Sequence, residues 1–252
     1  MATWIAHLRI AEKVFQKIIG LDEIPFLYGN LAPDSGLPNE DWTLYDPPKE
    51  VTHFLDEARG EDDIKDLIFY RQYLQGMDLS KQNSEYSFRL GYFTHLVTDQ
   101  FWWNKIGITM EAINQELFST HSRGEAIGIL KTDWYDLDHK YLRDHPGYVV
   151  WQKFFESGIP EIGLPFMPQN AFEIQMKFIK DYYTTPDQAR ILDRAYPYLN
   201  EKILNLFIDE TSKSIIRLIH LLDEGLHTDS KNSSLSLLSP ADSASYYPPL
   251  GD

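Results

Sequence analysis

The segment GYFTHLVTDQFWW, residues 91–103, is the most informative part of the sequence for the fold. Its apolar and aromatic side chains belong to a pattern of helical spacing that covers about residues 84–105. His95 and Asp99 are four positions apart, so they lie on one face of that helix. A buried imidazole and carboxylate with no Lys or Arg beside them need a partner. A divalent cation is one such partner, and a His–Asp hydrogen bond in the core is an equally good interpretation.

Helical spacing recurs on both sides of this segment. Trp4 to Ile18 place His7 and several apolar residues on one stripe, which Gly20 ends. Residues 21–50 are rich in proline and glycine, so we expect a long ordered loop there. The longest pattern after the central segment covers about residues 199–225. Further helices are expected near residues 50–58, 61–77, 109–119, 134–143, 147–156 and 168–184.

No stretch shows convincing strand alternation, so the sequence predicts an all-α fold, a single multi-helix domain over residues 1–228. A chain of 252 residues with 43% hydrophobic residues is long enough to bury a sizeable core. The expected core positions include Leu8, Phe15, Phe88, Tyr92, Leu96, Leu204, Ile208 and Leu218. Residues 229–252 are dominated by Ser, Pro, Asp and Asn without an apolar period, so we expect a disordered tail.

The composition restricts the possible partners and ligands. A formal net charge of −15 argues against undirected nucleic-acid binding, although bound cations would still allow a phosphate-bearing substrate. The sequence has no cysteine, so a metal would be held by His, carboxylates, backbone groups or water. Charged residues interrupt the N-terminal apolar pattern, and no apolar run approaches the length of about 18 residues needed for a membrane span. We therefore expect a soluble cytoplasmic protein of undetermined oligomeric state.

Three other residues are candidate ligands, each weak by itself. His7 lies on a buried stripe, where a histidine is more often a satisfied core residue than a ligand. Asp34, in the run APDSG, can simply bond its own backbone in a turn. His53 can be a surface residue near the start of a helix.

Taken together, the order of these motifs resembles the zinc-dependent phospholipase C family. That family includes bacterial phospholipases C, the amino-terminal domain of the glycosylphosphatidylinositol-specific phospholipase D and, more distantly, the zinc single-strand nucleases. The resemblance covers roughly residues 2–145 and implies a helical fold of the phospholipase C and zinc nuclease type. It implies that the metal ligands are His7, Asp34, His53, His95 and Asp99. It also makes Asp34 the base for the attacking water and Asp99 a bridge between metal ions.

The sequence departs from the family pattern in two places. Members with three zinc ions have another histidine shortly after the HxxxD motif, where this chain has Gln100 to Lys105. They also have a His and an acid four apart on a later helix, where this chain offers the substitutes Asp136, Asp138 and His139, which can equally be helix-surface residues. We therefore expect one or two zinc ions, or another divalent metal. If Met1 were removed, the amine of Ala2 would be a further ligand, as the family resemblance implies.

Several aromatic residues near these motifs can line a hydrophobic substrate groove or fill the core. They are Trp42, Trp102, Trp103, Trp134 and Tyr135. The resemblance implies a zinc-dependent hydrolase of the phosphodiesterase or phospholipase C type, acting on a small phosphoester or a lipid-like substrate. A nuclease-like phosphodiesterase is one alternative, and a helical metal-binding protein without catalysis is another.

Overall fold

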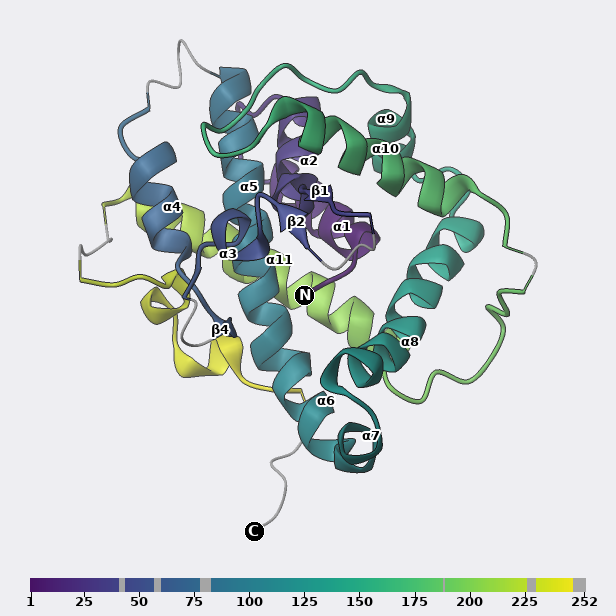
Figure 1. Ribbon diagram of the computed structural model, residues 1–252. Coiled ribbons are helices and arrows are strands. Elements are labelled where there is room, and N and C mark those ends of the chain that lie inside the picture. The colour runs from purple at the N-terminus through teal and green to yellow at the C-terminus, as the bar shows by residue number, and fades with distance from the viewer. Residues whose placement is uncertain (41–43, 57–59, 78–82, 188, 226–229, 247–252) are drawn as a thin grey trace.

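The computed structural model describes residues 1–40, 44–56, 60–77, 83–187, 189–225 and 230–246 (Figure 1). Helices form most of the described chain, which confirms the all-α fold class. The described strands are short antiparallel pairs, β1 (Leu37–Pro38) with β2 (Tyr45–Asp46) and β3 (Leu55–Asp56) with β4 (Gly60–Ile64). None of the helices in the described residues is both long and apolar enough to cross a membrane.

Helix α5 (Asn83–Trp102) lies at the centre of the fold and contains most of the segment that opened the sequence. Every residue from Leu90 to Trp102 is buried. A helix that is buried on all sides must be surrounded by other elements, and α1, α2, α4 and α11 all pack against α5. The helix continues through a π-helical turn, Trp103–Gly107, into α6 (Ile108–Ile113).

Helices α2 (Glu23–Leu31) and α5 cross at two glycines. A Cβ atom on Gly29 would lie 1.9 Å from the carbonyl oxygen of Phe88, and one on Gly91 would lie 2.2 Å from that of Phe26. Only glycine therefore permits this approach of the two backbones. The close crossing brings Asn30 of α2 beside the face of α5 that carries His95.

The expectation of a loop over residues 21–50 is wrong for its first part, because α2 lies within it. Pro25 is the third residue of this helix, where the backbone N–H has no intrahelical partner to lose. Gly29 provides room for α5 instead of ending the helix. Both residues were interpreted as breaks in regular structure, whereas here they fit a helix.

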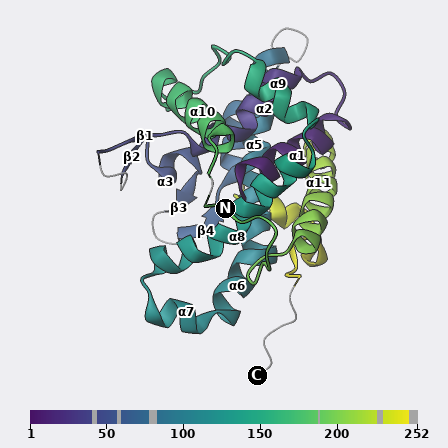
Figure 2. The ribbon, with the colours of Figure 1, turned by 90° about the vertical axis from the view of Figure 1, so that its right-hand side faces the viewer.

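The other helices surround this pair. Helix α1 (Trp4–Phe15) packs against α2 and against α11 (Glu201–Asp223), as Figure 2 shows from the side. The N-terminus lies in the middle of the molecule in both views. The remaining helices are α3 (Lys49–Thr52), α4 (Asp66–Tyr73), α7 (Gln115–Thr120), α8 (Arg123–Asp144), α9 (Val149–Glu156) and α10 (Gln169–Thr184).

Several of these helices differ in length from the expectation. The helix expected near residues 50–58 is confined to α3, because the chain forms β3 at Leu55–Asp56. The helix expected over residues 61–77 is confined to α4, because β4 occupies residues 60–64. Helix α8 begins eleven residues before the expected position 134. Its start is fixed by a capping box, in which Ser122 and Glu125 satisfy each other's backbone N–H groups.

Seven of the eight expected core positions are buried, and Phe15 is partly buried against the same core. Residues 230–246, in contrast, differ from the expected disordered tail. Ser234 is fully buried and its backbone N–H donates a hydrogen bond of 2.8 Å to Asp66 of α4. Leu238 is buried as well. Two short 3-10 turns, Ser234–Leu237 and Pro240–Ser243, place the few apolar side chains of this segment on the core. Such turns need no apolar period, so the sequence pattern did not reveal them.

Candidate metal centre

Five polar side chains from four segments of the chain meet in the interior of the protein. His7 comes from α1, Asp34 ends the 3-10 turn Ala32–Asp34, and His53 directly follows α3. His95 and Asp99 project from the same face of α5. Their atoms form two overlapping groups, His7, His95 and Asp99 in one and Asp34, His53 and His95 in the other. Within each group the candidate ligand atoms all lie within 4.8 Å of one another.

Asp99 lies between three imidazole rings. Its Oδ1 is 3.3 Å from Nε2 of His7, and its Oδ2 is 3.3 Å from Nε2 of His95. Oδ2 is also 3.6 Å from Nε2 of His53. The side chain is almost fully buried, so it has little water to share these contacts with. This position suits a carboxylate that bridges two halves of one site.

Asp34 closes the second group. Its Oδ1 lies 3.5 Å from Nε2 of His53, which is itself 3.4 Å from Nε2 of His95. Its other oxygen, Oδ2, accepts a hydrogen bond of 2.8 Å from the indole nitrogen of Trp4. The Asp34 side chain is 12% exposed, against 1% for Asp99. Asp34 is therefore the more accessible of the two carboxylates.

Second contacts orient the ring nitrogens of two histidines. Nδ1 of His95 lies 2.8 Å from the carbonyl oxygen of Asn30, which can only accept a hydrogen bond. His95 therefore donates from Nδ1 and, when neutral, presents a bare Nε2 to the centre. Nδ1 of His53 lies 2.9 Å from the hydroxyl of Thr52, which can hold that ring in the same way. Contacts of this kind are typical of metal-binding histidines.

The spacing of these atoms fits a metal site better than a hydrogen-bonded cluster. Direct hydrogen bonds of this type have heavy-atom distances of about 2.7–3.2 Å. Two ligands at about 2.0–2.2 Å from a tetrahedral zinc ion are instead roughly 3.3–3.6 Å apart. The distances between His7, His53, His95 and the two carboxylates are 3.3–3.6 Å.

Unsatisfied polar atoms at the centre support the same interpretation. Nε2 of His7 and Oδ2 of Asp99 are buried and have no hydrogen-bond partner among the described residues. Such atoms are costly to bury unless something satisfies them. A divalent cation bound by imidazole nitrogens and carboxylate oxygens does so, and the set of donors suits zinc.

The electrostatics of the centre also suit metal binding. Burial lowers the pKa of His7 to about 4 and also lowers the pKa of His53, so both rings are neutral near pH 7. Burial opposes ionisation of Asp34, but the hydrogen bond with His53 and the nearby His95 hold its pKa below the usual range. Asp99 is likewise held ionised against its burial by His95 and His7. His95 alone among the three rings has a raised pKa: burial lowers it, but Asp99 outweighs that effect.

Ala2, the other residue considered as a ligand, lies at the centre. Its backbone nitrogen donates a hydrogen bond of 2.9 Å to Oδ1 of Asp99. The same oxygen faces His7, so the start of the chain contacts the first group of candidate ligands directly.

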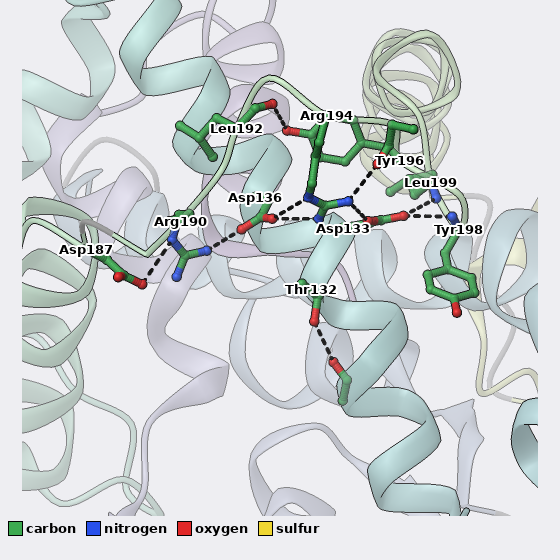
Figure 3. Close-up of polar contacts among 12 residues, drawn as sticks. Thr132, Asp133, Asp136, Asp187, Arg190, Leu192, Arg194, Tyr196, Tyr198 and Leu199 are labelled. Carbon is green, nitrogen blue, oxygen red and sulfur yellow. Dashed lines mark hydrogen bonds and ion pairs between the residues drawn. The ribbon is translucent and has the colours of Figure 1, made fainter. Parts of the chain in front are cut away.

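Asp136 lies outside the two groups of candidate ligands and is occupied by arginines. Figure 3 shows its carboxylate between Arg190, at 2.5 Å, and Arg194, at 2.6 Å. Arg194 also pairs with Asp133 at 2.6 Å. Asp133 and Asp136 therefore connect α8 through ion pairs to the segment that precedes α11. The hypothesis that Asp136 substitutes for a missing ligand therefore finds no support in this geometry.

Asp138 and His139 also have other surroundings. Asp138 accepts hydrogen bonds from the side chain of Thr3, at 2.8 Å, and the backbone N–H of Ile5, at 3.2 Å. Burial raises its pKa to about 7. Asp138 thus fixes the start of α1, three positions before His7. His139 is half-buried beside Tyr183, with ring centroids 5.0 Å apart. Neither Asp138 nor His139 belongs to the two groups of candidate metal ligands.

The aromatic residues divide into core and cavity. Trp102 is fully buried and packs edge-on against Trp134, with ring centroids 5.0 Å apart. Trp42 lies outside the described residues. Trp134 and Tyr135 line a cavity of about 230 Å³ that reaches Asp34, hereafter the Asp34 cavity. Trp103 lines a second cavity of about 140 Å³ that reaches His53 and Asp99, hereafter the His53 cavity.

Trp4, Asn30 and Thr52 are the residues at the centre that sequence reasoning missed. Trp4 precedes His7 by three positions on the same helix face, and this spacing is a signal that could have found it. Asn30 acts through its backbone carbonyl, which no side-chain pattern can reveal. Thr52 directly precedes His53, and only the fold shows that its hydroxyl meets the ring.

Comparisons with known proteins agree with this centre. The model of a family described as zinc dependent phospholipase C matches residues 6–162. The matched range contains His7, Asp34, His53, His95 and Asp99. Neither the curated proteins nor the solved structures include a significant match.

Proposed function

The chain belongs to the zinc-dependent phospholipase C family, and on this premise we propose that it hydrolyses a phosphodiester bond in the manner of a phospholipase C. The substrate is a lipid or a similar small phosphoester. His7, His95 and Asp99 would hold one metal position, and Asp34, His53 and His95 an adjacent one. His95 belongs to both groups but presents a single bare nitrogen, Nε2, so it can bind only one ion at a time, and the proposed number of zinc ions is one or two.

Zinc in such a site polarises phosphoryl oxygens and lowers the pKa of a bound water. Asp34 takes the proton of the attacking water. Its Oδ2 accepts the hydrogen bond from Trp4, and its Oδ1 faces His53 at 3.5 Å. Its low pKa keeps it ionised, and its partial exposure to the Asp34 cavity lets water reach it. Asp99 is more deeply buried and its oxygens already face His7, His53 and His95, so Asp34 is the proposed base.

Two cavities reach the centre and can accommodate the parts of a substrate. The Asp34 cavity has aromatic walls that include Trp4, Trp134 and Tyr135. The His53 cavity is smaller and reaches Asp99 past Trp103. A phosphate at the centre would place its two ester groups toward these two spaces.

One observation supports this proposal more strongly than the alternative functions. Three imidazoles and two carboxylates from four segments have their facing atoms at the 3.3–3.6 Å spacing of ligands around zinc. The nuclease-like alternative has no comparable support, because a net charge of −15 repels a polyanion. A metal-binding protein without catalysis would have the same ligands, so only an assay separates it.

The test is turnover of bis-p-nitrophenyl phosphate by purified protein with and without a chelator. We expect zinc-dependent hydrolysis that Asp34→Asn nearly abolishes, because an amide cannot accept the proton of the water. Asp181→Asn, an exposed position on α10, is the matched control and should retain full activity. Phospholipid vesicles and single-stranded DNA then serve as competing substrates.

Undiminished hydrolysis by the Asp34→Asn variant would rule out Asp34 as the base. Absence of hydrolysis in a wild-type protein that holds stoichiometric zinc would favour the non-catalytic alternative. Faster hydrolysis of the DNA than of the vesicles would favour the nuclease.

A further inference from the structure

The Asp34 cavity has an unusual distribution of charge for so acidic a protein. Among its described lining residues, Asp34 is the only carboxylate, and its charge faces the metal centre. Lys49 and Lys131 contribute two positive charges to the same walls. The whole chain, in contrast, has a formal net charge of −15. A cation entering this cavity would meet two like charges, whereas an anion would meet two opposite ones.

Of the two lysines, only Lys49 lines both of the cavities that reach the metal centre. Its Nζ is 3.5 Å from the Sδ atom of Met1, and both residues line the Asp34 cavity and the His53 cavity. The lysine begins α3, whose C-terminal end carries Thr52 and His53 toward the metal ligands. Its ammonium group also lies near enough to Asp34 to help keep that carboxylate ionised.

Two buried hydrogen-bonding groups of the same cavity have no partner. The hydroxyl of Ser35 and the indole N–H of Trp134 are both without a hydrogen bond among the described residues. Ser35 is 2% exposed and Trp134 is 5% exposed, so bulk water does not compensate them. The indole can only donate, and the hydroxyl can donate. Both line the cavity, where an anionic oxygen would satisfy them.

We propose that the Asp34 cavity binds the part of the substrate beyond the scissile phosphate and that this part is anionic, a phosphorylated alcohol. The inference rests on the proposed hydrolysis of a phosphodiester at the adjacent metal centre. Lys49 and Lys131 bind the second phosphate, and Ser35 and Trp134 donate hydrogen bonds to its oxygens. The aromatic walls form the sides of the space around the alcohol.

The aromatic walls allow an opposite hypothesis, a cage for a quaternary ammonium group. Such a cage gains from carboxylates and loses from nearby cations, because the ligand carries a positive charge. Here Trp4 already packs against Tyr135 in a tilted arrangement and edge-on against Phe178, with ring centroids 5.5 and 5.9 Å apart. Together with the two lysines, this arrangement favours the anionic group.

The experiment compares two soluble head groups by isothermal titration calorimetry on zinc-loaded protein. Inositol 1,4-bisphosphate represents a product whose alcohol part is anionic, and phosphocholine one whose alcohol part is cationic. We expect the bisphosphate to bind at least about tenfold more tightly, a difference of about 1.4 kcal/mol. Lys49→Gln and Lys131→Gln should each reduce that preference severalfold and leave the affinity for phosphocholine unchanged or higher. Lys213→Gln, an exposed position on α11, is the matched control and should keep the full preference.

Equal binding of the two head groups, or tighter binding of phosphocholine, would overturn the inference. An unchanged preference in both lysine variants would overturn it too. Turnover of bis-p-nitrophenyl phosphate by the same samples tests the proposed function separately. If the protein hydrolyses bis-p-nitrophenyl phosphate but does not prefer the bisphosphate, only the inference about the cavity is contradicted. If it prefers the bisphosphate but does not hydrolyse the ester, only the proposed hydrolysis is contradicted. Phosphatidylinositol 4-phosphate in vesicles and its deacylated form then distinguish a lipid from a soluble source of the same head group.

Discussion

Trp4 donates a hydrogen bond of 2.8 Å from its indole nitrogen to Oδ2 of Asp34, across 30 positions of the chain. Trp4 begins α1, and His7 follows it one helical turn later. One helix therefore supplies a candidate ligand and also orients the proposed base. Because Asp138 holds the start of α1 through Thr3 and Ile5, the orientation of Asp34 depends on contacts outside the centre.

The first prediction concerns this contact. Trp4→Phe keeps an aromatic ring in place and removes only the N–H donor. We expect hydrolysis to fall about tenfold, since a hydrogen bond to a charged group contributes roughly 1.5–3 kcal/mol. Zinc content should stay constant, which elemental analysis would check alongside the kinetics. Trp151→Phe, on α9, is the control and should leave both quantities unchanged, and a parallel loss of zinc would show that Trp4 acts on the ligands instead.

Asp99 allows a test of the metal centre as a whole. Asp99→Ala removes the carboxylate that faces His7, His53 and His95, so we expect zinc to be lost. Metal binding stabilises the folded state by about 3 kcal/mol when free zinc is 100 times its dissociation constant. The variant should therefore melt at a lower temperature than the zinc-loaded wild type and respond little to a chelator. A chelator that lowers the melting temperature of both proteins equally would contradict this role.

The central part of the candidate site was predictable because its chemistry is local. His95 and Asp99 are four positions apart in an apolar helix, and that spacing fixes their common face before any tertiary contact is known. His7, Asp34 and His53 could be added only through the resemblance, since each has an ordinary explanation by itself. The structure brings all five to one place.

The parts that the sequence did not predict depend on contacts between distant segments. From the sequence alone, Gly29 indicates an interruption of the helix. Only the crossing of α5 shows that this glycine permits close packing of two helices. From the sequence, Asp136 has a suitable position for a metal ligand. The structure shows that Arg190 and Arg194, more than 50 positions later, neutralise its carboxylate. Ser234 lies in a segment of polar composition, and only Asp66 explains its burial.

Thr52 provides a test of the contacts behind the ligands. Thr52→Val removes the hydroxyl that lies 2.9 Å from Nδ1 of His53 and keeps the shape of the side chain. We expect zinc affinity to fall about 10- to 100-fold, the usual loss when the partner of a metal-binding histidine is removed. Competition with a zinc-binding dye would measure it. Thr184→Val, on the exposed end of α10, should bind zinc as the wild type does.

The N-terminus is predicted to take part in metal binding after removal of Met1. The nitrogen of Ala2 lies 2.9 Å from Asp99, so a free amine there would be in place to bind a metal. Met1 lines both the Asp34 cavity and the His53 cavity, so its removal would enlarge the space beside the centre. An N-terminal tag should therefore lower zinc content or activity relative to a C-terminal tag. Intact mass spectrometry that finds Met1 in an active, zinc-loaded protein would contradict the prediction.

Asp66 should make stability depend on pH without any metal. Burial raises its pKa to about 6, well above the usual pKa of an aspartate. The folded state therefore holds this proton more tightly than the unfolded state, so stability falls as pH rises from about 4 to about 6. The slope is at most on the order of 1.4 kcal/mol per pH unit. Asp66→Asn, which can still accept the hydrogen bond from the backbone of Ser234, should remove that slope. Urea unfolding of chelator-treated wild type and variant from pH 4.5 to 7 would measure it, and two parallel curves would show that Asp66 does not titrate there.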